Sequence, residues 1–260
     1  GGAVLVIRSH GVPPDTLQRF EERQVEICDA TCPFVAKIHR IVEQESQKGA
    51  TVLIAGDEGH PEVVGIRGFS HTPSYVFSSL EELEKLLRSG VIPVENPVIM
   101  VSQTTFNRFA WEKCVKFAKT LYTNLFVFDT ICNATAERQS EAVALSQVCD
   151  GMVIVGGRHS SNTAKLRDIC SAICPTVLVE RADELDPAWF RDKRTAGVTA
   201  GASTPADIIK EVLLTMSEIV NNNEVQETEA VETATKSFDE MSFEEALEAS
   251  LQSLSTDERV

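Results

Sequence analysis

The sequence predicts an α/β fold with largely parallel sheets. From the start of the chain to about residue 220, short apolar runs alternate with amphipathic helical patterns, and the runs continue into loops dense in Gly, Ser, Thr or His. A short, continuous apolar run is typical of a strand buried on both faces, and helices between such strands place them parallel. Ligands bind these folds beyond the carboxyl ends of the strands, which is where the polar loops fall.

Six apolar runs are the expected strands, in the order Ala3–Ile7, Thr51–Ala55, Val98–Val101, Leu125–Phe128, Met152–Val155 and Ala196–Thr199. Apolar residues at helical spacing indicate the helices between them. One helix has an apolar face of Val35, Ile38 and Val42, and another has a face of Trp111, Val115, Ala118 and Tyr122. With 43% hydrophobic residues in 260, the chain can bury a large core.

Residues 221–260 are a different kind of sequence. They hold eleven acidic and two basic side chains, a balance of −9 that leaves −6 of the total −15 for residues 1–220. The body therefore presents no basic surface for nucleic acid. Residues 221–236 predict a disordered acidic linker, and a capping box at 242–245 begins a predicted short amphipathic helix with the apolar residues Phe243, Leu247, Leu251 and Leu254. A solvated tail with a transient helix is the alternative.

Cysteine usage favours a reducing compartment. The seven cysteines are an odd number, no signal peptide precedes them, and no apolar run is long enough to span a bilayer, so we expect a cytoplasmic protein with no membrane contact. Five of the thiols are interpreted as packing residues. Cys114, Cys149, Cys170 and Cys174 occupy apolar positions within helical patterns, and Cys28 precedes Cys32 by one turn.

Cys32 and Cys132 are different, because each stands in the same short pattern. Residues 29–33 read Asp-Ala-Thr-Cys-Pro and residues 129–133 read Asp-Thr-Ile-Cys-Asn, and both follow an apolar run and open an amphipathic stretch. Each thiol is therefore expected at a strand-to-helix junction. A helix N-terminus favours the thiolate, which is the form that ligates metal, so both cysteines are predicted metal ligands.

Five further loops carry polar donors at the expected helix starts, where backbone N–H groups and the macrodipole favour an anion such as phosphate. They are residues 8–12 with His10, 59–63 with His60 and Glu62, 102–105 with Thr104, 156–162 with Ser160, Ser161 and Asn162, and 201–205 with Ser203. Each has a simpler alternative. Ser161, Asn162 and Ser203 are suited to helix capping, and Glu62 to a first-turn charge. His39, inside a helix, and His71, in a turn, are interpreted as ordinary surface residues.

Seven motifs in this order resemble the 4-hydroxy-3-methylbut-2-enyl diphosphate reductase family, the LytB-type iron–sulfur enzymes of the non-mevalonate isoprenoid pathway. They are Ser-His-Gly at 9–11, Ala-Thr-Cys-Pro at 30–33, Gly-His-Pro-Glu at 59–62, Ser-Gln-Thr-Thr at 102–105, Asp-Thr-Ile-Cys at 129–132, Ser-Ser-Asn at 160–162 and Thr-Ala-Gly-Ala-Ser at 199–203.

The resemblance implies three α/β modules related by pseudo-threefold symmetry around a central [4Fe–4S] cluster, with one cysteine ligand from each module. The module boundaries it implies are 1–31 for the remainder of the first module, 32–128 for the second, 129–204 for the third, 205–220 for a helix returning to the body, and 221–260 for the acidic tail. The first module is then incomplete.

The resemblance also implies the roles of the motif residues. Cys32 and Cys132 would ligate the cluster, and Glu62 would deliver a proton with Thr104 assisting. The diphosphate would be held by His10, His60, Thr104, Ser160, Ser161, Asn162 and Ser203. The reaction is reductive removal of the hydroxyl group of the allylic diphosphate, giving isopentenyl and dimethylallyl diphosphates, with a ferredoxin or flavodoxin as electron donor.

The chain departs from the family pattern at its start. Gly1-Gly2-Ala3 falls where the family's first module is already half complete, and neither the glycine-rich loop with the first cluster cysteine nor the histidine after it has a counterpart. We therefore expect an N-terminally truncated sequence, and the activity in the parent protein rather than in these 260 residues alone.

Two alternative functions remain open at this point. One is a quinolinate synthase-like enzyme, which also has three modules around one cluster. The other is a non-catalytic module fused to ribosomal-type OB-fold repeats, through which RNA or ribosome contact would arise.

Overall fold

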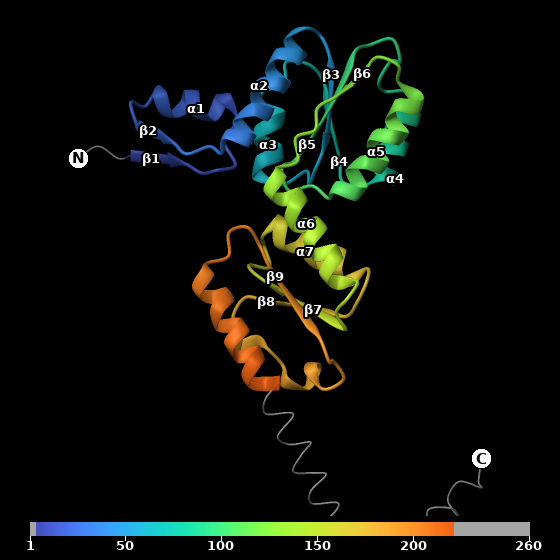
Figure 1. The fold of residues 1–260 in the computed structure, drawn as a ribbon. Helices are drawn as coiled ribbons and strands as arrows, with labels where there is room; N and C mark the ends of the chain where they lie inside the picture. Colours follow the sequence, from blue (N-terminus) through green and yellow to red (C-terminus); the bar gives the residue numbers. More distant parts are fainter. Residues whose placement is uncertain (1–3, 221–260) are drawn as a thin grey trace, which may run out of the picture.

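The computed structural model describes residues 4–220, and in these residues three parallel sheets pack against helices (Figure 1). The predicted acidic linker and amphipathic helix of 221–260 lie outside the described residues. The α/β class with parallel sheets is confirmed, because every strand pairing in the three sheets is parallel. No helix within 4–220 is both long and apolar enough to cross a membrane.

The first sheet has two strands, β1 (Val4–Ile7) and β2 (Glu26–Asp29), joined by α1 (Pro14–Glu21). The sheet contributes little to the cores, since only Ile7 among its residues is buried. The sheet matters for the site because the loops that follow both strands place polar side chains at the same edge, the carboxyl edge of the sheet.

The second sheet has the order β4-β3-β5-β6 and carries helices on both faces. Its strands are β3 (Thr51–Ala55), β4 (Ser74–Phe77), β5 (Val98–Ser102) and β6 (Leu125–Val127), and its helices are α2 (Pro33–Gln47), α3 (Pro61–Gly68), α4 (Leu80–Arg88) and α5 (Arg108–Leu121). Every residue of β3 and β5 is buried, as expected for central strands covered on both sides.

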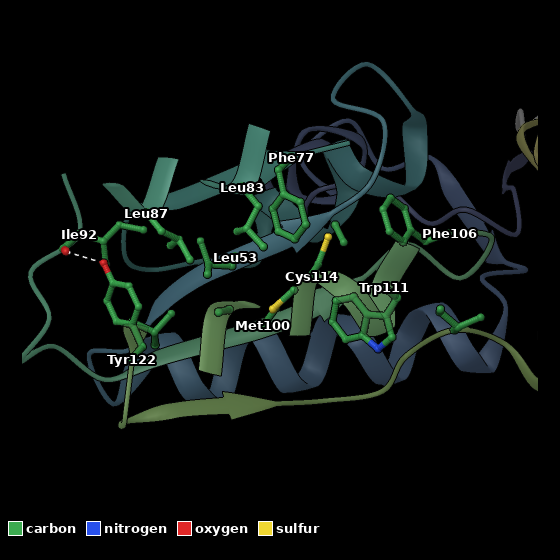
Figure 2. Close-up of a cluster of buried hydrophobic side chains, with 14 residues drawn as sticks. Leu53, Phe77, Leu83, Leu87, Ile92, Met100, Phe106, Trp111, Cys114 and Tyr122 are labelled. Carbon is green, nitrogen blue, oxygen red and sulfur yellow. Dashed lines mark hydrogen bonds between the residues drawn. The ribbon is translucent and has the colours of Figure 1, made fainter. Parts of the chain in front are cut away.

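Alternate residues of these central strands enter two separate cores. Leu53 and Met100 point to α4 and α5, where Phe77, Leu83, Trp111 and Cys114 complete the core (Figure 2). Val52, Ile54, Ile99 and Val101 point to the opposite face and pack on α2 and α3. Tyr122 closes one end of the first core, and its hydroxyl donates to the Ile92 carbonyl at 2.8 Å. A buried Tyr hydroxyl needs such a partner.

The third sheet has the order β8-β7-β9, built from β7 (Gly151–Val155), β8 (Thr176–Val179) and β9 (Ala196–Ala200). One face is covered by α6 (Asn133–Ser146) and α7 (Ser161–Ser171), which pack on each other. The other face is covered by the helix of residues 206–220, through Val212, Met216 and Ile219. Two short 3-10 turns, Ala182–Glu184 and Pro187–Phe190, connect β8 to β9.

All six predicted strands are present, but three more were missed. These are β2, β4 and β8, each of four residues at the edge of its sheet. None of the three holds more than three consecutive apolar residues, so their sequences give a weaker strand signal.

The interpretation of His39 as a surface residue is wrong. His39 lies in α2, is 5% exposed, and stacks on Phe69 with ring centroids 4.2 Å apart. Burial lowers the pKa of His39 to about 4. The placement of two cysteines also needs correction. Cys149 and Cys174 are partly buried just beyond the ends of α6 and α7, not inside helices.

Candidate active site between the three sheets

Loops beyond the strand ends of all three sheets converge on one cleft of about 520 Å³. All ten residues predicted for the site line this cleft, although they come from positions 10 to 203 of the chain. They are His10, Cys32, His60, Glu62, Thr104, Cys132, Ser160, Ser161, Asn162 and Ser203. The structure therefore brings every predicted site residue together.

Cys32 and Cys132 occupy equivalent positions, as their shared pattern predicted. Each is the N-cap residue of a helix that follows a strand, Cys32 before α2 and Cys132 before α6, and neither side chain caps its own helix. Each backbone is fixed by a bond to the neighbouring strand's loop, from Cys32 N to the Ser9 carbonyl at 3.0 Å and from Cys132 N to the Thr104 carbonyl at 3.1 Å. Both thiols are therefore held at the cleft with no competing intrahelical partner.

Glu62 is the buried acid of the cleft. It lies in the first turn of α3, yet it is only 2% exposed and turns inward, unlike the surface first-turn charge considered as its alternative. Its two carboxylate oxygens accept bonds from the backbone N and the hydroxyl of Thr104, at 2.6 and 2.8 Å. Burial raises the pKa of Glu62, and the two bonds from Thr104 partly oppose that effect.

His10 and His60 meet edge to face, with ring centroids 5.1 Å apart. His60 is the N-cap of α3, and its Nδ1 accepts the Glu62 N–H at 3.2 Å, so the neutral ring carries its proton on Nε2. Burial lowers the pKa of both rings, with help from Arg8 at His10 and from His10 at His60. Two neutral imidazoles can each donate one hydrogen bond to an anion.

The start of α7 contributes three consecutive polar residues. Ser160 is the N-cap and accepts the Thr163 N–H at 3.4 Å, so the capping role considered for Ser161 and Asn162 belongs to their neighbour. Asn162 is 5% exposed, and neither its amide nitrogen nor its amide oxygen has a hydrogen-bond partner in the described residues. A buried amide left without partners is costly, which indicates that a ligand supplies them.

Ser203 is not a helix cap either. The first backbone bond of the last helix runs from Ile209 N to the Pro205 carbonyl, two residues beyond Ser203, and the Thr204 hydroxyl instead donates to the Val155 carbonyl at 3.0 Å. Ser203 is exposed at the rim of the cleft. Ser203 therefore belongs to the loop that precedes the last helix, not to the helix end.

Several cleft residues were not singled out from the sequence. The polar ones are Arg8, Ser9, Thr105, Thr135 and His159, and the apolar ones include Phe34 and Val35. Arg8, Ser9, Thr105 and His159 stand in the polar loops already recognised, so their loop membership was an available signal. No sequence signal marked Phe34 and Val35 as site residues, because their helical spacing is equally typical of core residues.

Within residues 4–220, no three His, Cys, Asp or Glu side chains are placed to hold a metal ion together. The two cleft thiols nevertheless have the donor chemistry of iron–sulfur ligands, and both stand at helix N-termini that line the cleft. The described residues therefore fit two ligand positions of a cluster.

Comparison with known proteins places this geometry in a family. The model of the LytB protein family matches residues 2–217. Among curated proteins, a 4-hydroxy-3-methylbut-2-enyl diphosphate reductase of Caldanaerobacter subterraneus is 44% identical over 213 residues, covering 82% of this chain and 72% of that protein. An enzyme of the same name from Geobacter sulfurreducens is 42% identical, covering 85% of this chain and 77% of that protein.

Two solved structures share the fold. The E-1-hydroxy-2-methyl-but-2-enyl-4-diphosphate reductase from Plasmodium falciparum has a TM-score of 0.77 at 25% identity, over 82% of this chain and 66% of that one. A structure of (E)-4-hydroxy-3-methyl-but-2-enyl diphosphate reductase, described as the terminal enzyme of the non-mevalonate pathway, has a TM-score of 0.54 at 34% identity, over 84% and 78%. With its family model matched over most of its length and its strand ends gathered on one cleft, the chain belongs to the LytB protein family.

Proposed function

We propose that this chain forms the substrate cleft of an oxidoreductase that removes the hydroxyl group from 4-hydroxy-3-methylbut-2-enyl diphosphate. The observation that carries the proposal is the buried Asn162 amide, which has no hydrogen-bond partner among the described residues, in a cleft that also holds the Glu62 carboxyl group and two thiols. This reaction requires an anion-binding site, a proton-donating acid and ligands for iron in the same cleft. Membership of the LytB family supports the same reaction.

Cys32 and Cys132 would hold a [4Fe–4S] cluster at the edge of the cleft. When bound, such a cluster supplies electrons one at a time and a Lewis-acidic iron for the substrate oxygen. Replacing either thiolate would expose iron to solvent, because each ligand also shields the cluster. A ferredoxin or flavodoxin would deliver the electrons.

The diphosphate would lie against the starts of α3 and α7, where the helix macrodipole favours negative charge. His10 and His60 would donate from their rings, and Ser160, Ser161, Asn162 and Ser203 from the third sheet's loops. Anchoring one end of the substrate from several elements fixes the position of the other end, which lowers the entropic part of the barrier.

Glu62 would protonate the leaving hydroxyl group so that it departs as water. Burial disfavours the carboxylate and so raises the pKa of Glu62, which favours the protonated acid that this role needs. Thr104 would orient the carboxyl group, because it holds both oxygens at once. When Glu62 is protonated on the oxygen that faces the Thr104 hydroxyl, that hydroxyl accepts a hydrogen bond instead of donating one. The Thr104 backbone N–H still donates to the other carboxyl oxygen.

The family match favours the diphosphate reductase over the quinolinate synthase-like alternative. The buried acid and the unpartnered amide favour an enzyme over a non-catalytic module, since a bare scaffold has no use for either. RNA contact through a fused region would require sequence beyond the described residues.

The test is calorimetric titration of the chain with inorganic diphosphate. We expect wild type to bind and Asn162→Ala to bind at least tenfold more weakly, as expected when about 1.5–3 kcal/mol of charged hydrogen bonding is lost. Asn124→Ala is the matched control. The Asn124 amide oxygen also has no partner within residues 4–220, but Asn124 lies just before β6, away from the cleft lining. Equal affinities for Asn162→Ala and wild type would contradict the proposed anion site.

A further inference from the structure

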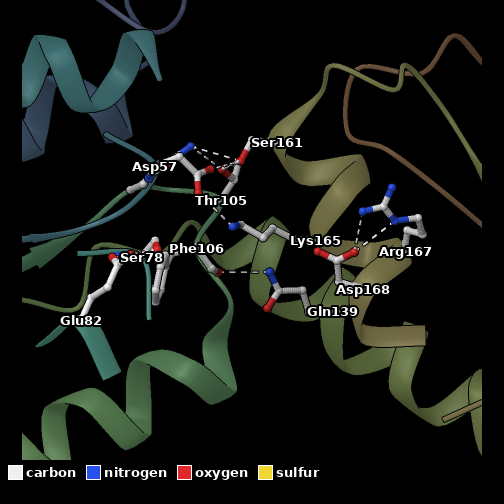
Figure 3. A network of polar contacts seen from close by, with 11 residues as sticks. Asp57, Ser78, Glu82, Thr105, Phe106, Gln139, Ser161, Lys165, Arg167 and Asp168 are labelled. Carbon is white, nitrogen blue, oxygen red and sulfur yellow. Dashed lines mark hydrogen bonds and ion pairs between the residues drawn. The ribbon is translucent and has the colours of Figure 1, made fainter. Parts of the chain in front are cut away.

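A polar network ties the start of α7 to the loops of the second sheet, across the boundary between two sheets (Figure 3). The Ser161 hydroxyl lies 3.2 Å from the Gln103 amide nitrogen, 3.2 Å from the Thr105 hydroxyl and 3.3 Å from an Asp57 carboxylate oxygen. Lys165, one turn further along α7, binds the other oxygen of Asp57 at 3.1 Å. None of these contacts was anticipated from the motifs.

Gln103 fixes the polarity of the Ser161 hydroxyl. The Gln103 side chain is fully buried, and its oxygen accepts the Asp57 N–H at 3.1 Å, so its nitrogen must be the group that faces Ser161. An amide nitrogen only donates, which makes the Ser161 oxygen an acceptor there and leaves its own proton to be given elsewhere. An Asp57 carboxylate oxygen at 3.3 Å can accept that proton, and the Thr105 hydroxyl at 3.2 Å is the other oxygen within reach.

Asp57 is an unexpected neighbour for an anion site. Its carboxylate lies within hydrogen-bond reach of Ser161, a cleft residue, and it acts electrostatically on His60 as well. A negative charge at that distance opposes the entry of a diphosphate. Lys165 offsets it, and the Lys165 ammonium is held in place by the Asp57 carboxylate and lies over the buried Phe106 ring, 5.9 Å from its centroid.

We propose that Lys165 is a charge-compensating and positioning residue for the diphosphate site. By pairing with Asp57, Lys165 neutralises the negative charge beside the site and weakens the Asp57 carboxylate as a hydrogen-bond acceptor. The Ser161 hydroxyl then donates its hydrogen bond to the incoming anion instead of to Asp57. Lys165 does not touch the ligand in this arrangement, since it acts through Asp57 and does not line the cleft. The inference rests on the proposed function, because it takes the Ser160–Asn162 loop as a diphosphate subsite.

A double-mutant cycle with inorganic diphosphate as the probe tests this. Lys165→Met should weaken binding by about tenfold or more, as an uncompensated carboxylate a few ångströms from an anion would. Asp57→Asn in the Lys165→Met background should return the affinity to within about threefold of wild type, because the offending charge is then gone. Lys165→Arg should bind like wild type. Lys193→Met is the control, since Lys193 is a buried lysine of the third module outside the cleft.

The melting temperature of each variant without ligand separates positioning from structure. If the Lys165–Asp57 pair were purely structural, the double variant would lose diphosphate affinity in parallel with its melting temperature. The proposal instead expects restored affinity whether or not the melting temperature recovers. Weak binding by the double variant would show that Lys165 contacts the diphosphate directly and would overturn the inference. Unchanged binding by Lys165→Met overturns it too, while leaving the proposed function intact. If wild type binds no diphosphate, both proposals fall.

Discussion

Thr104 holds both oxygens of the Glu62 carboxyl group, one through its backbone N–H and one through its hydroxyl. The two residues follow adjacent parallel strands, since β3 leads to Glu62 and β5 leads to Thr104. The backbone carbonyl of the same Thr104 accepts the Cys132 N–H. One residue thus fixes the buried acid and the backbone of a candidate iron ligand, so their relative positions are set by the register of the second sheet.

Glu62→Gln should abolish proton delivery while preserving the site's shape. In the cluster-loaded enzyme we expect turnover to fall by about 10²-fold or more, with diphosphate affinity unchanged, because Gln keeps the hydrogen-bonding geometry but cannot donate the reacting proton. Glu58→Gln, on an exposed side chain four residues earlier, is the matched control and should turn over like wild type. Wild-type turnover in Glu62→Gln would reduce Glu62 to a structural residue.

The dependence of turnover on pH tests the role of Glu62 in a second way. The acid form of Glu62 is the active one, so turnover should decline as pH rises through the raised pKa of Glu62. Thr104→Val removes the hydroxyl but keeps the backbone N–H. One of the bonds that stabilises the carboxylate is then lost, so the decline should move to higher pH. A shift in the opposite direction would contradict the assigned role of Thr104.

Cys132→Ser should lower the iron content of the chain after anaerobic reconstitution with iron and sulfide. A serine hydroxyl is a harder ligand than a thiolate and binds iron–sulfur iron poorly. Iron and sulfide assays, with the broad visible absorption of the cluster, measure the loss. Cys149→Ser is the control, because Cys149 packs against the apolar cluster between α6, α7 and β7 and lies outside the cleft. Equal iron in Cys132→Ser and wild type would remove Cys132 from the ligand set.

Ser203 and Ser160 should respond differently to replacement by Ala. Ser160 caps α7, so Ser160→Ala should cost about 0.5–2 kcal/mol of unfolding free energy and also weaken diphosphate binding. Ser203 caps no helix, so Ser203→Ala should weaken diphosphate binding with little effect on unfolding. Denaturant titration and calorimetry measure the two quantities. If Ser203→Ala destabilised the fold and bound normally, its proposed contact with the anion would be wrong.

His39 predicts a pH dependence of stability. Its pKa is about 4 in the fold, below the usual value near 6.5, so the unfolded chain takes up its proton first as pH falls. The stability that His39 contributes is therefore complete above about pH 6.5 and is lost between about 6.5 and 4, by up to about 3 kcal/mol. His39→Leu should remove this part of the dependence, whereas His71→Leu, on an exposed turn, should retain it. The unfolding free energy at pH 7 and pH 5 decides between them.

The sequence by itself determined the α/β class, the central strands and the positions of the two cleft cysteines. These features are local: a continuous apolar run marks a strand covered on both faces, and a polar residue after it marks a helix start. The strands β2, β4 and β8 were missed because each holds at most three consecutive apolar residues, and their pairing in a sheet depends on neighbours that are distant in sequence.

Only the tertiary structure decided which polar residue does what at the cleft. Residue type suggested capping for Ser161, Asn162 and Ser203, but the fold gave the cap to Ser160 and left the Asn162 amide without a partner. The pairing of Glu62 with Thr104, and of Asp57 with Lys165, joins residues 42 and 108 positions apart. Contacts of this kind follow from strand register and from the packing of α7 against a loop of the second sheet, and neither is written in a single stretch of sequence.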